Sequence, residues 1–304
     1  MDNVCHTLVG AAMGEAGLKQ TTRYGMPVLL VAANLPDVDV LAIAADVPLV
    51  ALRRGWTHGV LAQVLLPALF AGCVLLYDRL RRAPSGGTPA RLMPLLALSY
   101  AGVLSHVFLD WLNTYGIRLL MPFSPRWFYG DAVFIVDPWL WLVFGAGTLL
   151  ARRRAAARPA RVAIVVASLY IAAMVWSARA ARALVMEAWT REASRPPAAL
   201  MVGPAPLDPL RKQVIVDAGD HYRRGTFTWW PRRITFDPQI VRRQEDRPEV
   251  ARAKRDHDVG AILVWARFPY YEMQPLEGAT RVTVSDMRFG SRVGSTSVTV
   301  PVDR

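Results

Sequence analysis

Two long apolar runs set the strongest constraint on the fold of this chain. Residues 58–78 and 92–112 each hold 21 residues, most of them apolar. An α-helix of that length is about 30 Å long, which is the thickness of the hydrocarbon core of a bilayer. The sequence therefore predicts helices that span a membrane. Residues 134–151 and 161–180 are expected to form two more.

The composition agrees with a membrane protein that also has a water-soluble part. Hydrophobic residues make up 53% of the 304 residues, charged residues make up 20%, and the mean hydropathy is +0.23. These values are too apolar for a disordered chain. The two cysteines, Cys5 and Cys73, exclude a disulfide framework and a CxxC zinc motif.

The first residues predict shorter helices. Residues 3–18 are rich in glycine and alanine, which allow helices to pack closely in a membrane. Residues 26–36 are apolar but too short to cross alone, so the two segments are expected to form a hairpin. A third short piece is expected at 40–52. The N-terminus has no basic segment before its apolar residues, so no cleavable signal is expected and His6 should be retained.

The chain changes character after the last apolar run, where charges and prolines return. Alternating polar and apolar residues predict a mainly β region. The expected strands are 213–217, 226–236, 260–268, 280–288 and 295–300. The predicted fold is thus an all-α polytopic membrane domain at 1–184, with about four full transmembrane helices and a short N-terminal hairpin, followed by a small β-rich soluble domain at 185–304.

The distribution of positive charge indicates how the helices are oriented. The net charge is +12, but 11 of the 17 basic residues in 1–184 lie in three short segments next to apolar runs: Lys19 and Arg23; Arg79, Arg81, Arg82 and Arg91; Arg152, Arg153, Arg154, Arg158 and Arg161. Positive charge concentrates in cytoplasmic loops of membrane proteins, so no nucleic-acid partner is needed to explain it. If the three basic segments face the cytoplasm, the β-rich domain is extracytoplasmic.

The pair His106 and Asp110 is the most specific chemical signal in the sequence. Their spacing of four places both side chains on one helix face about 6 Å apart, which suits chelation of a divalent ion. A carboxylate in such an apolar helix is costly and indicates a functional site. A buried hydrogen bond that joins helices is the equally weighted alternative.

Further candidate ligands follow from the predicted orientation, which brings acids and histidines to the outer face. Alone, each has an ordinary structural explanation as a turn, cap or interfacial residue. Together they comprise every histidine and five of the nine acids of the membrane half: His6, His58, His106, Asp37, Asp39, Asp110, Asp131 and Asp137. Of these, Asp39, His58, His106 and Asp110 are the first-choice ligands.

Carboxylates mixed with imidazoles favour a transition metal. Zn²⁺ is the first choice, with Mn²⁺ or Fe²⁺ as alternatives, and one to two ions are expected. Such sites activate water and clamp a phosphoryl group. The carboxylates Asp37, Asp39 and Asp110 are the catalytic candidates, since one that does not bind metal can act as general base. The sequence has no Walker, GxSxG or strand-linked GxGxxG motif.

In the segments that hold these candidate ligands, the sequence resembles the YdjM-like, LexA-regulated bacterial proteins. This family is described as predicted membrane-bound metal-dependent hydrolases. The resemblance covers about residues 1–150. It rests on six segments: His6 with Gly10, Asn34–Asp39, Arg54–Gly59, Ser105–Gly116, Met121–Trp127 and Phe134–Pro138. It implies a multi-pass protein of the bacterial cytoplasmic (inner) membrane that binds metal.

That family is remotely similar to the zinc-dependent phospholipase C and single-strand nuclease superfamily. The ligand order of that superfamily maps to His6, Asp37 or Asp39, His58, His106 and Asp110. Two features differ. The superfamily uses the amine of an N-terminal tryptophan as a ligand, and Met1 is no equivalent of it. The superfamily also has later ligands, for which Asp131 and Asp137 would have to substitute.

The sequence thus predicts a membrane-bound metal-dependent hydrolase. The expected substrate is a phosphoester in a lipid or lipid-linked molecule at the outer face. The arginines Arg53, Arg54 and Arg126 lie on the same side and can neutralise a phosphate, although interfacial snorkelling explains them equally well. The alternative function is a non-catalytic metal-binding protein of transport or envelope assembly. The oligomeric state is not indicated.

Overall fold

The computed structural model describes residues 1–45, 49–81, 90–290 and 295–301. The chain forms two compact units. The first comprises Met1–Leu41 with Arg53–Ser177, and the second comprises Ala42–Leu52 with Ala178–Arg304. The division falls between residues 177 and 178, inside a long helix, whereas the sequence suggested a boundary at 184.

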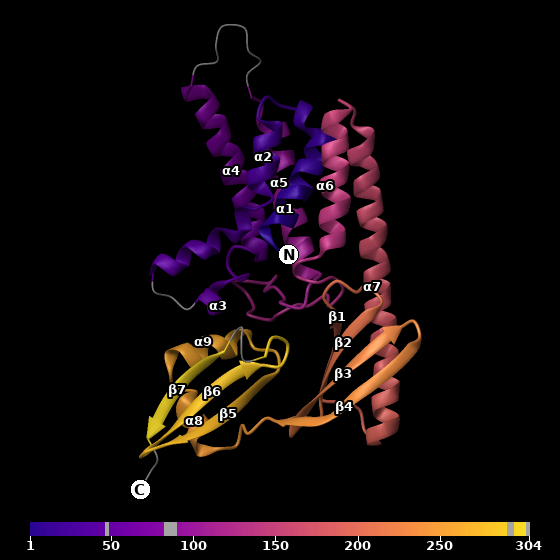
Figure 1. Cartoon of the computed structure of the whole chain (residues 1–304). Coiled ribbons are helices and arrows are strands. Elements are labelled where there is room, and N and C mark those ends of the chain that lie inside the picture. The colour runs from indigo at the N-terminus through magenta and orange to yellow at the C-terminus, as the bar shows by residue number, and fades with distance from the viewer. Residues whose placement is uncertain (46–48, 82–89, 291–294, 302–304) are drawn as a thin grey trace. The chain divides into compact units, whose positions relative to one another are not determined.

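The first unit is helical, and Figure 1 shows its helices running side by side. The helices and short 3-10 turns are α1 (Asn3–Glu15), η1 (Leu18–Gln20), α2 (Gly25–Ala32), η2 (Leu35–Ala45), α4 (Val60–Leu80), α5 (Leu92–Trp111), α6 (Pro138–Arg153) and the first part of α7 (Arg158–Ala193). The expected N-terminal hairpin is formed by α1 and α2. In the region expected as a third short piece, η2 ends at Ala45 and α3 covers Leu49–Leu52, while residues 46–48 lie outside the description.

Three helices of the described chain, α4, α5 and α7, are long and apolar enough to cross a membrane. The fourth expected span, 134–151, forms α6, which has 16 residues and begins at Pro138. Asp137 caps this helix, because its side chain accepts hydrogen bonds from the backbone N–H groups of Trp139 and Leu140. The preceding residues are therefore outside the helix, and α6 is only about 24 Å long.

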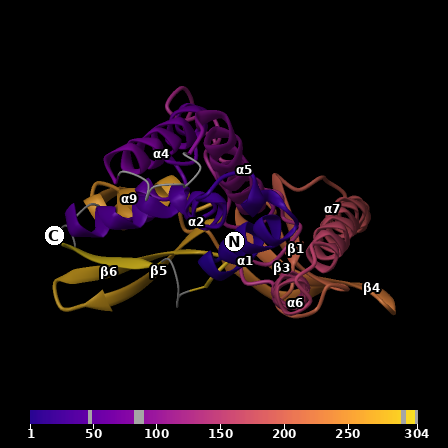
Figure 2. The same cartoon turned by 90° about the horizontal axis from the view of Figure 1, so that it is seen from above.

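Small residues allow the short helices to approach α5 closely. Helix α2 packs against both α1 and α5, which lie next to each other when viewed from above (Figure 2). A side chain at Gly102 of α5 would come within 2.6 Å of Ala32 Cβ and 2.9 Å of the backbone N of Ala33. The glycine lets the two backbones approach, as small residues do in membrane helices.

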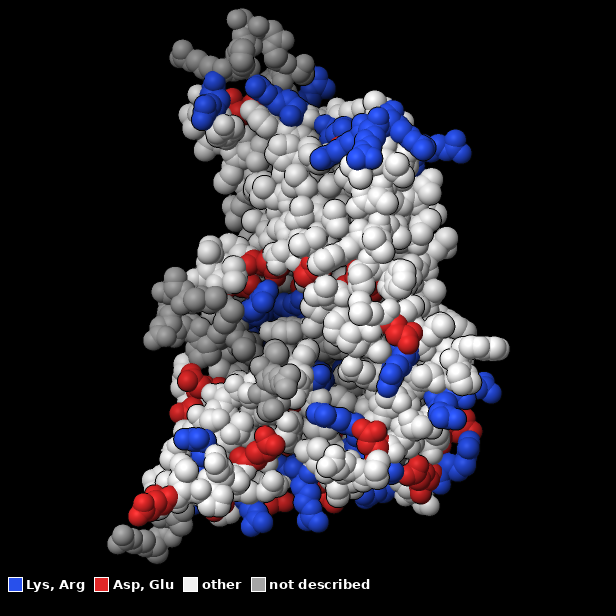
Figure 3. Space-filling view, viewed as in Figure 1, with Lys and Arg blue, Asp and Glu red and all other residues white. Residues whose placement is uncertain are grey.

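The three basic segments gather at one end of the helical unit. In the space-filling view, Lys and Arg cluster at that end and an uncharged band follows (Figure 3). The described members include Arg79 in the last turn of α4 and Arg152 and Arg153 in the last turn of α6. Arg82 lies outside the described residues. This arrangement is the charge pattern that the sequence predicted.

The second unit contains two antiparallel sheets. The first has strand order β1-β2-β3-β4 and the second has order β5-β6-β7. Their bounds are β1 (Ala199–Pro204), β2 (Arg211–Asp217), β3 (His221–Trp229), β4 (Arg232–Arg242), β5 (Pro269–Leu276), β6 (Ala279–Asp286) and β7 (Thr296–Pro301). The end of α7 packs on the first sheet through Ala181, Val185 and Trp189. The helices α8 (Pro248–Ala253) and α9 (His257–Trp265) pack on the second.

The strand predictions were partly right. The expected strands 213–217, 280–288 and 295–300 correspond to β2, β6 and β7, whereas 226–236 is split by the β3–β4 turn. The prediction of a strand at 260–268 was wrong, because α9 occupies most of this segment. Asp256 caps α9 by accepting from Asp258 N and Val259 N, and a short apolar run fits a buried helix as well as a strand. Strands β1 and β5 were missed.

The contact of α5 with α2 makes a testable prediction. Gly102→Ala should lower the melting temperature, because the added methyl group meets backbone atoms of α2 and overpacking costs about 1–3 kcal/mol. The control is Gly72→Ala in α4, where an added Cβ meets nothing within 4 Å, so it should be neutral or slightly stabilising. Thermal unfolding in detergent measures both. Equal melting temperatures for the two variants would contradict the described packing.

Candidate metal centre

Four side chains meet at the end of the helical unit opposite the basic cluster. One ligand atom from each of Asp37, His58, His106 and Asp110 lies within 4.8 Å of the others, and all four residues are buried. Asp37 lies in η2, directly after α2, His58 lies just before α4, and the other two lie on the last two turns of α5. Residues from three parts of the sequence thus form one group that can hold a metal ion.

The backbone of α2 sets the protonation of His106. Its Nδ1 lies 2.7 Å from the carbonyl oxygen of Ala33. A carbonyl oxygen only accepts hydrogen bonds, so Nδ1 carries a proton, and in the neutral ring Nε2 presents its lone pair. That Nε2 faces His58 Nε2 at 3.2 Å and Asp110 Oδ2 at 3.5 Å. This ring is therefore oriented as a metal-binding histidine is oriented by its outer partner.

His58 is oriented through Thr57 and Asp39. The hydroxyl of Thr57 lies 3.2 Å from Asp39 Oδ2 and 3.0 Å from His58 Nδ1. If the hydroxyl donates to the carboxylate, it accepts from Nδ1–H, and His58 Nε2 is left with a free lone pair. Asp39 also accepts a hydrogen bond of 2.9 Å from the backbone N–H of Arg54. The structure therefore places Asp39 behind His58 and places Asp37 in the group of four.

The donor set fits a cation better than a network of hydrogen bonds. The buried Oδ2 of Asp110 has no hydrogen bond within the described chain, although His58 Nε2 lies 3.3 Å away. Buried polar atoms without partners are rare and require an explanation. Two imidazole lone pairs and two carboxylates match the nitrogen and oxygen ligands and the fourfold coordination of zinc. These four residues would hold one divalent ion.

His6 and the first residue lie against this group. The His6 ring stacks on His106 with centroids 3.7 Å apart, and its Nε2 lies 3.4 Å from Asp110 Oδ1. The amino group of Met1 is buried and forms an ion pair with Asp110. This amine is paired with a candidate ligand and is not one of the group of four.

Two arginines border the group of four. Arg54 Nη2 lies 2.9 Å from Asp110 Oδ1, and its Nη1 donates to Asn113 Oδ1 at 3.0 Å. Arg53 Nη2 lies 3.3 Å from Asp37 Oδ1, and this side chain is 30% exposed. Arg126 is exposed and lies over the ring of Phe128. Of the three arginines proposed from the sequence, Arg53 and Arg54 thus contact the carboxylates of the site.

Neighbouring charged groups favour the ionised forms of Asp37 and Arg53. Burial alone would raise the pKa of the Asp37 carboxyl, but the opposing electrostatic effect of His106 and the other histidines is larger, and the pKa is lowered. Burial would lower the pKa of the Arg53 guanidinium, but Asp37, Tyr115 and Asp39 outweigh it, and the pKa is raised. Asp37 and Arg53 therefore carry opposite charges at neutral pH.

The last two predicted ligands have other partners. Asp137 caps α6 and accepts a hydrogen bond of 3.0 Å from the hydroxyl of Tyr170. Asp131 is half-buried in the loop before α6, with a positive φ of 50°. Neither belongs to the group of four. Sequence reasoning also missed Asn113, although it lies in the string Ser105–Gly116, three residues after Asp110.

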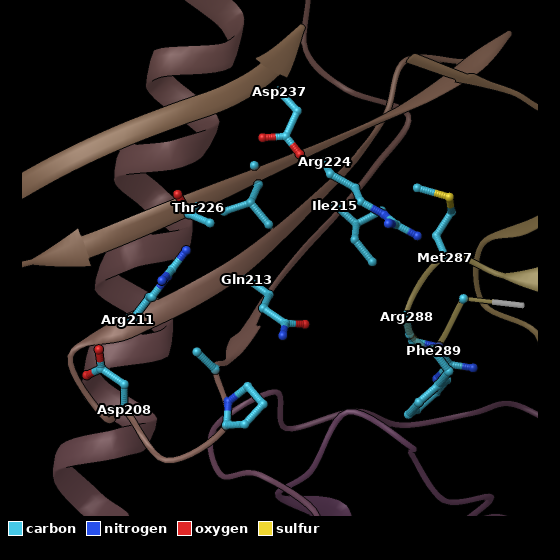
Figure 4. Close-up of a pocket in the computed structure, with 15 residues that line it drawn as sticks. Asp208, Arg211, Gln213, Ile215, Arg224, Thr226, Asp237, Met287, Arg288 and Phe289 are labelled. Carbon is cyan, nitrogen blue, oxygen red and sulfur yellow. The ribbon is translucent and has the colours of Figure 1, made fainter. Parts of the chain in front are cut away.

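The second unit has a cavity of about 580 Å³ between the first sheet and the turn after β6 (Figure 4). Its polar lining includes Arg211, Gln213, Arg224 and Thr226. Arg288 also lines it, but its guanidinium is held by Asp286 at 3.0 Å. The lining contains no histidine or cysteine. The cavity therefore has no counterpart of the mixed imidazole and carboxylate set found in the helical unit.

The helices and the buried group together define a membrane protein with a candidate site for a divalent cation. The family profile of the YdjM inner membrane protein matches residues 1–181, and the chain belongs to this family. The Bacillus subtilis (strain 168) protein "Uncharacterized protein YfhP" is 25% identical over 155 residues. This match covers 47% of the chain and 43% of YfhP, so the chain spans less than half of that relative. No solved structure matches.

The site predicts that the purified protein binds metal. Protein purified in detergent without chelator should contain about one transition-metal ion per chain, as four ligands imply. The double variant His106→Ala, Asp110→Ala and the milder Asp110→Asn should lose most of it, and mass spectrometry measures the metal.

The matched control is Asp78→Asn. Asp78 is also a buried acid of the helical unit, but it is bound by Arg23, Tyr24 and Ala90 N, away from the site. This variant should keep the metal of the wild type. Substoichiometric metal in the wild type after reconstitution with Zn²⁺ or Mn²⁺ would exclude the site.

Proposed function

We propose that this protein is a membrane-bound, metal-dependent hydrolase of phosphoesters in lipid or lipid-linked substrates. The observation that carries the proposal is the convergence of two imidazole Nε2 atoms and two carboxylates, all buried, beside two arginines. A bound divalent ion would lower the pKa of a water molecule and stabilise charge on the phosphoryl group.

The chain itself would bind and orient the phosphate. Arg53 is partly exposed and borders Asp37, so its guanidinium can bind phosphate oxygens. Arg54 is fixed by Asp110, Asn113 and the ring of Tyr115, whose centroid is 4.5 Å from its Cζ. A preorganised guanidinium loses little entropy when it meets an anion. Asp39, outside the group of four, would hold His58 in place through the Thr57 hydroxyl.

An apolar crevice supports a lipid as the substrate. The crevice has a volume of about 310 Å³ and is lined by residues of α2 and α4. Along α2 its lining runs from Tyr24 through Pro27 to Val31, and Asp37 follows six residues later. An acyl chain in this crevice would therefore bring a headgroup toward the metal ligands.

The charge distribution supports an outer-face site. The basic residues lie at the end of the helices opposite the metal ligands, and such residues mark the cytoplasmic side. In this orientation the site and the C-terminal unit are extracytoplasmic.

One observation favours a non-catalytic function instead. The guanidinium of Arg54 is already bound by Asp110, Asn113 and the carbonyl of Met1, so its donors serve the fold. A metal-binding protein of transport or envelope assembly would need no free arginine donor. Metal bound at full occupancy, with no turnover of any phosphoester, would favour this function.

The activity test compares two neighbouring aspartates. With protein in nanodiscs and a panel of phospholipids and lipid-linked phosphates, Asp37→Asn should reduce hydrolysis by more than about 100-fold, because outer partners of metal ligands alone contribute about 10–100-fold. Asp39→Asn should keep its acceptor toward Arg54 N and cost about tenfold or less. Release of the phosphorylated headgroup measures both. The reverse order would assign the metal to Asp39.

The orientation is tested with reporter fusions. Fusions after Arg81 and after Arg154 should be cytoplasmic, and fusions after Thr114 and after Arg304 should be extracytoplasmic. Paired enzymatic reporters that are active on opposite sides measure the location. A cytoplasmic C-terminal fusion would place the metal ligands at the inner face and contradict the proposed location of the substrate.

A further inference from the structure

The second unit exposes large apolar side chains on two of its turns. Within the described residues from 178 onward, six large apolar residues are exposed, and three of them lie on the β1–β2 and β3–β4 turns. Leu207 is 70% exposed, Leu210 is 52% exposed and Trp230 is 86% exposed. Soluble surfaces rarely gather such residues without a partner.

The two turns form one structural tip. The backbone N–H of Trp229 donates to the carbonyl of Leu210 at 2.9 Å, which joins the turns directly. The β3–β4 turn is closed by a hydrogen bond of 2.8 Å from the Thr228 hydroxyl to the Pro231 carbonyl. We call the tip residues Leu207, Leu210, Arg211, Trp230, Arg232 and Arg233 the turn patch.

The charges of the turn patch are complementary to an anionic surface. Its three arginines are exposed, and the described chain contains no ion pair from any of them. Asp208, the acid nearest in sequence, accepts a hydrogen bond from Leu210 N. Tryptophan and leucine beside arginine are typical of segments that lie in the headgroup region of a membrane.

Helix α7 indicates which way the turn patch points. The opposite end of the sheet meets the end of α7, where Arg223 pairs with Glu192 and Arg195 donates to the Ala218 carbonyl. The six residue steps from Val216 to Leu210 extend about 20 Å, so the turn patch lies at the end of the sheet away from this contact.

We propose that the turn patch inserts into the headgroup region of an anionic phospholipid bilayer. Leu207, Leu210 and Trp230 would enter the interface, and the arginines would bind lipid phosphates. The sheet would then be held against the membrane by this tip as well as by α7. This proposal does not depend on metal binding or on hydrolysis.

The experiment uses full-length protein in nanodiscs that contain anionic phospholipid. The exposed Cys73 is first replaced by serine, and the other cysteine, Cys5, is buried. In this background, a polarity-sensitive fluorophore is attached to Leu207→Cys or to Trp230→Cys. The controls are Ile240→Cys and Leu276→Cys, which are also exposed residues of the same unit. Lipids with a spin label near the headgroup should quench the fluorophore at 207 and 230 several times more strongly than at the controls.

The charge contribution is tested separately. Arg232→Ala with Arg233→Ala should reduce quenching at 207, and more so in anionic than in zwitterionic lipid. The matched pair Arg242→Ala and Arg247→Ala should not. Circular dichroism checks that each variant is folded. Equal quenching at 207, 230 and the controls would overturn the proposal. So would weak quenching by lipid together with a dimeric mass, which would assign the patch to a second copy of the chain.

Discussion

The buried carboxylate of Asp110 is the feature on which the helical unit depends. A charge at the end of an apolar helix is tolerated only if other groups neutralise it. Here the Met1 amino group, the Arg54 guanidinium and three imidazole rings surround one carboxylate. The first helix, the loop before α4 and the end of α5 must therefore meet at one point. The ligand group is complete only when η2, this loop and the end of α5 are assembled.

Close helix packing determines the chemistry of the ligands. Gly102 lets α5 approach the end of α2, and four residues later on α5 His106 contacts the Ala33 carbonyl. The same contact selects the ring tautomer that leaves Nε2 free. Gly102 thus helps to select the tautomer of His106, a candidate ligand one turn further along α5.

Spacing and charge within the sequence predicted the helical hairpin and four spanning helices, of which α4, α5 and α7 are long and apolar enough to cross a membrane. They also predicted one face for eight candidate ligands, of which Asp37, His58, His106 and Asp110 form the buried group. What the sequence could not supply were contacts between distant residues. The preference for Asp39 over Asp37 as a ligand depended on which carboxylate faces inward, and this is decided by Thr57 and the backbone of Arg54. The α9 segment was mistaken for a strand because nine residues are too few to distinguish the two periodicities.

The contact between His106 and Ala33 has a consequence for genetics. The acceptor is a main-chain oxygen, so any residue at position 33 supplies it, apart from changes that move α2. Alanine scanning and covariation report only side chains and would find nothing at this position. An ester in place of the peptide bond after residue 33 weakens the carbonyl as an acceptor, and semisynthesis could therefore reveal a determinant that mutational screens overlook.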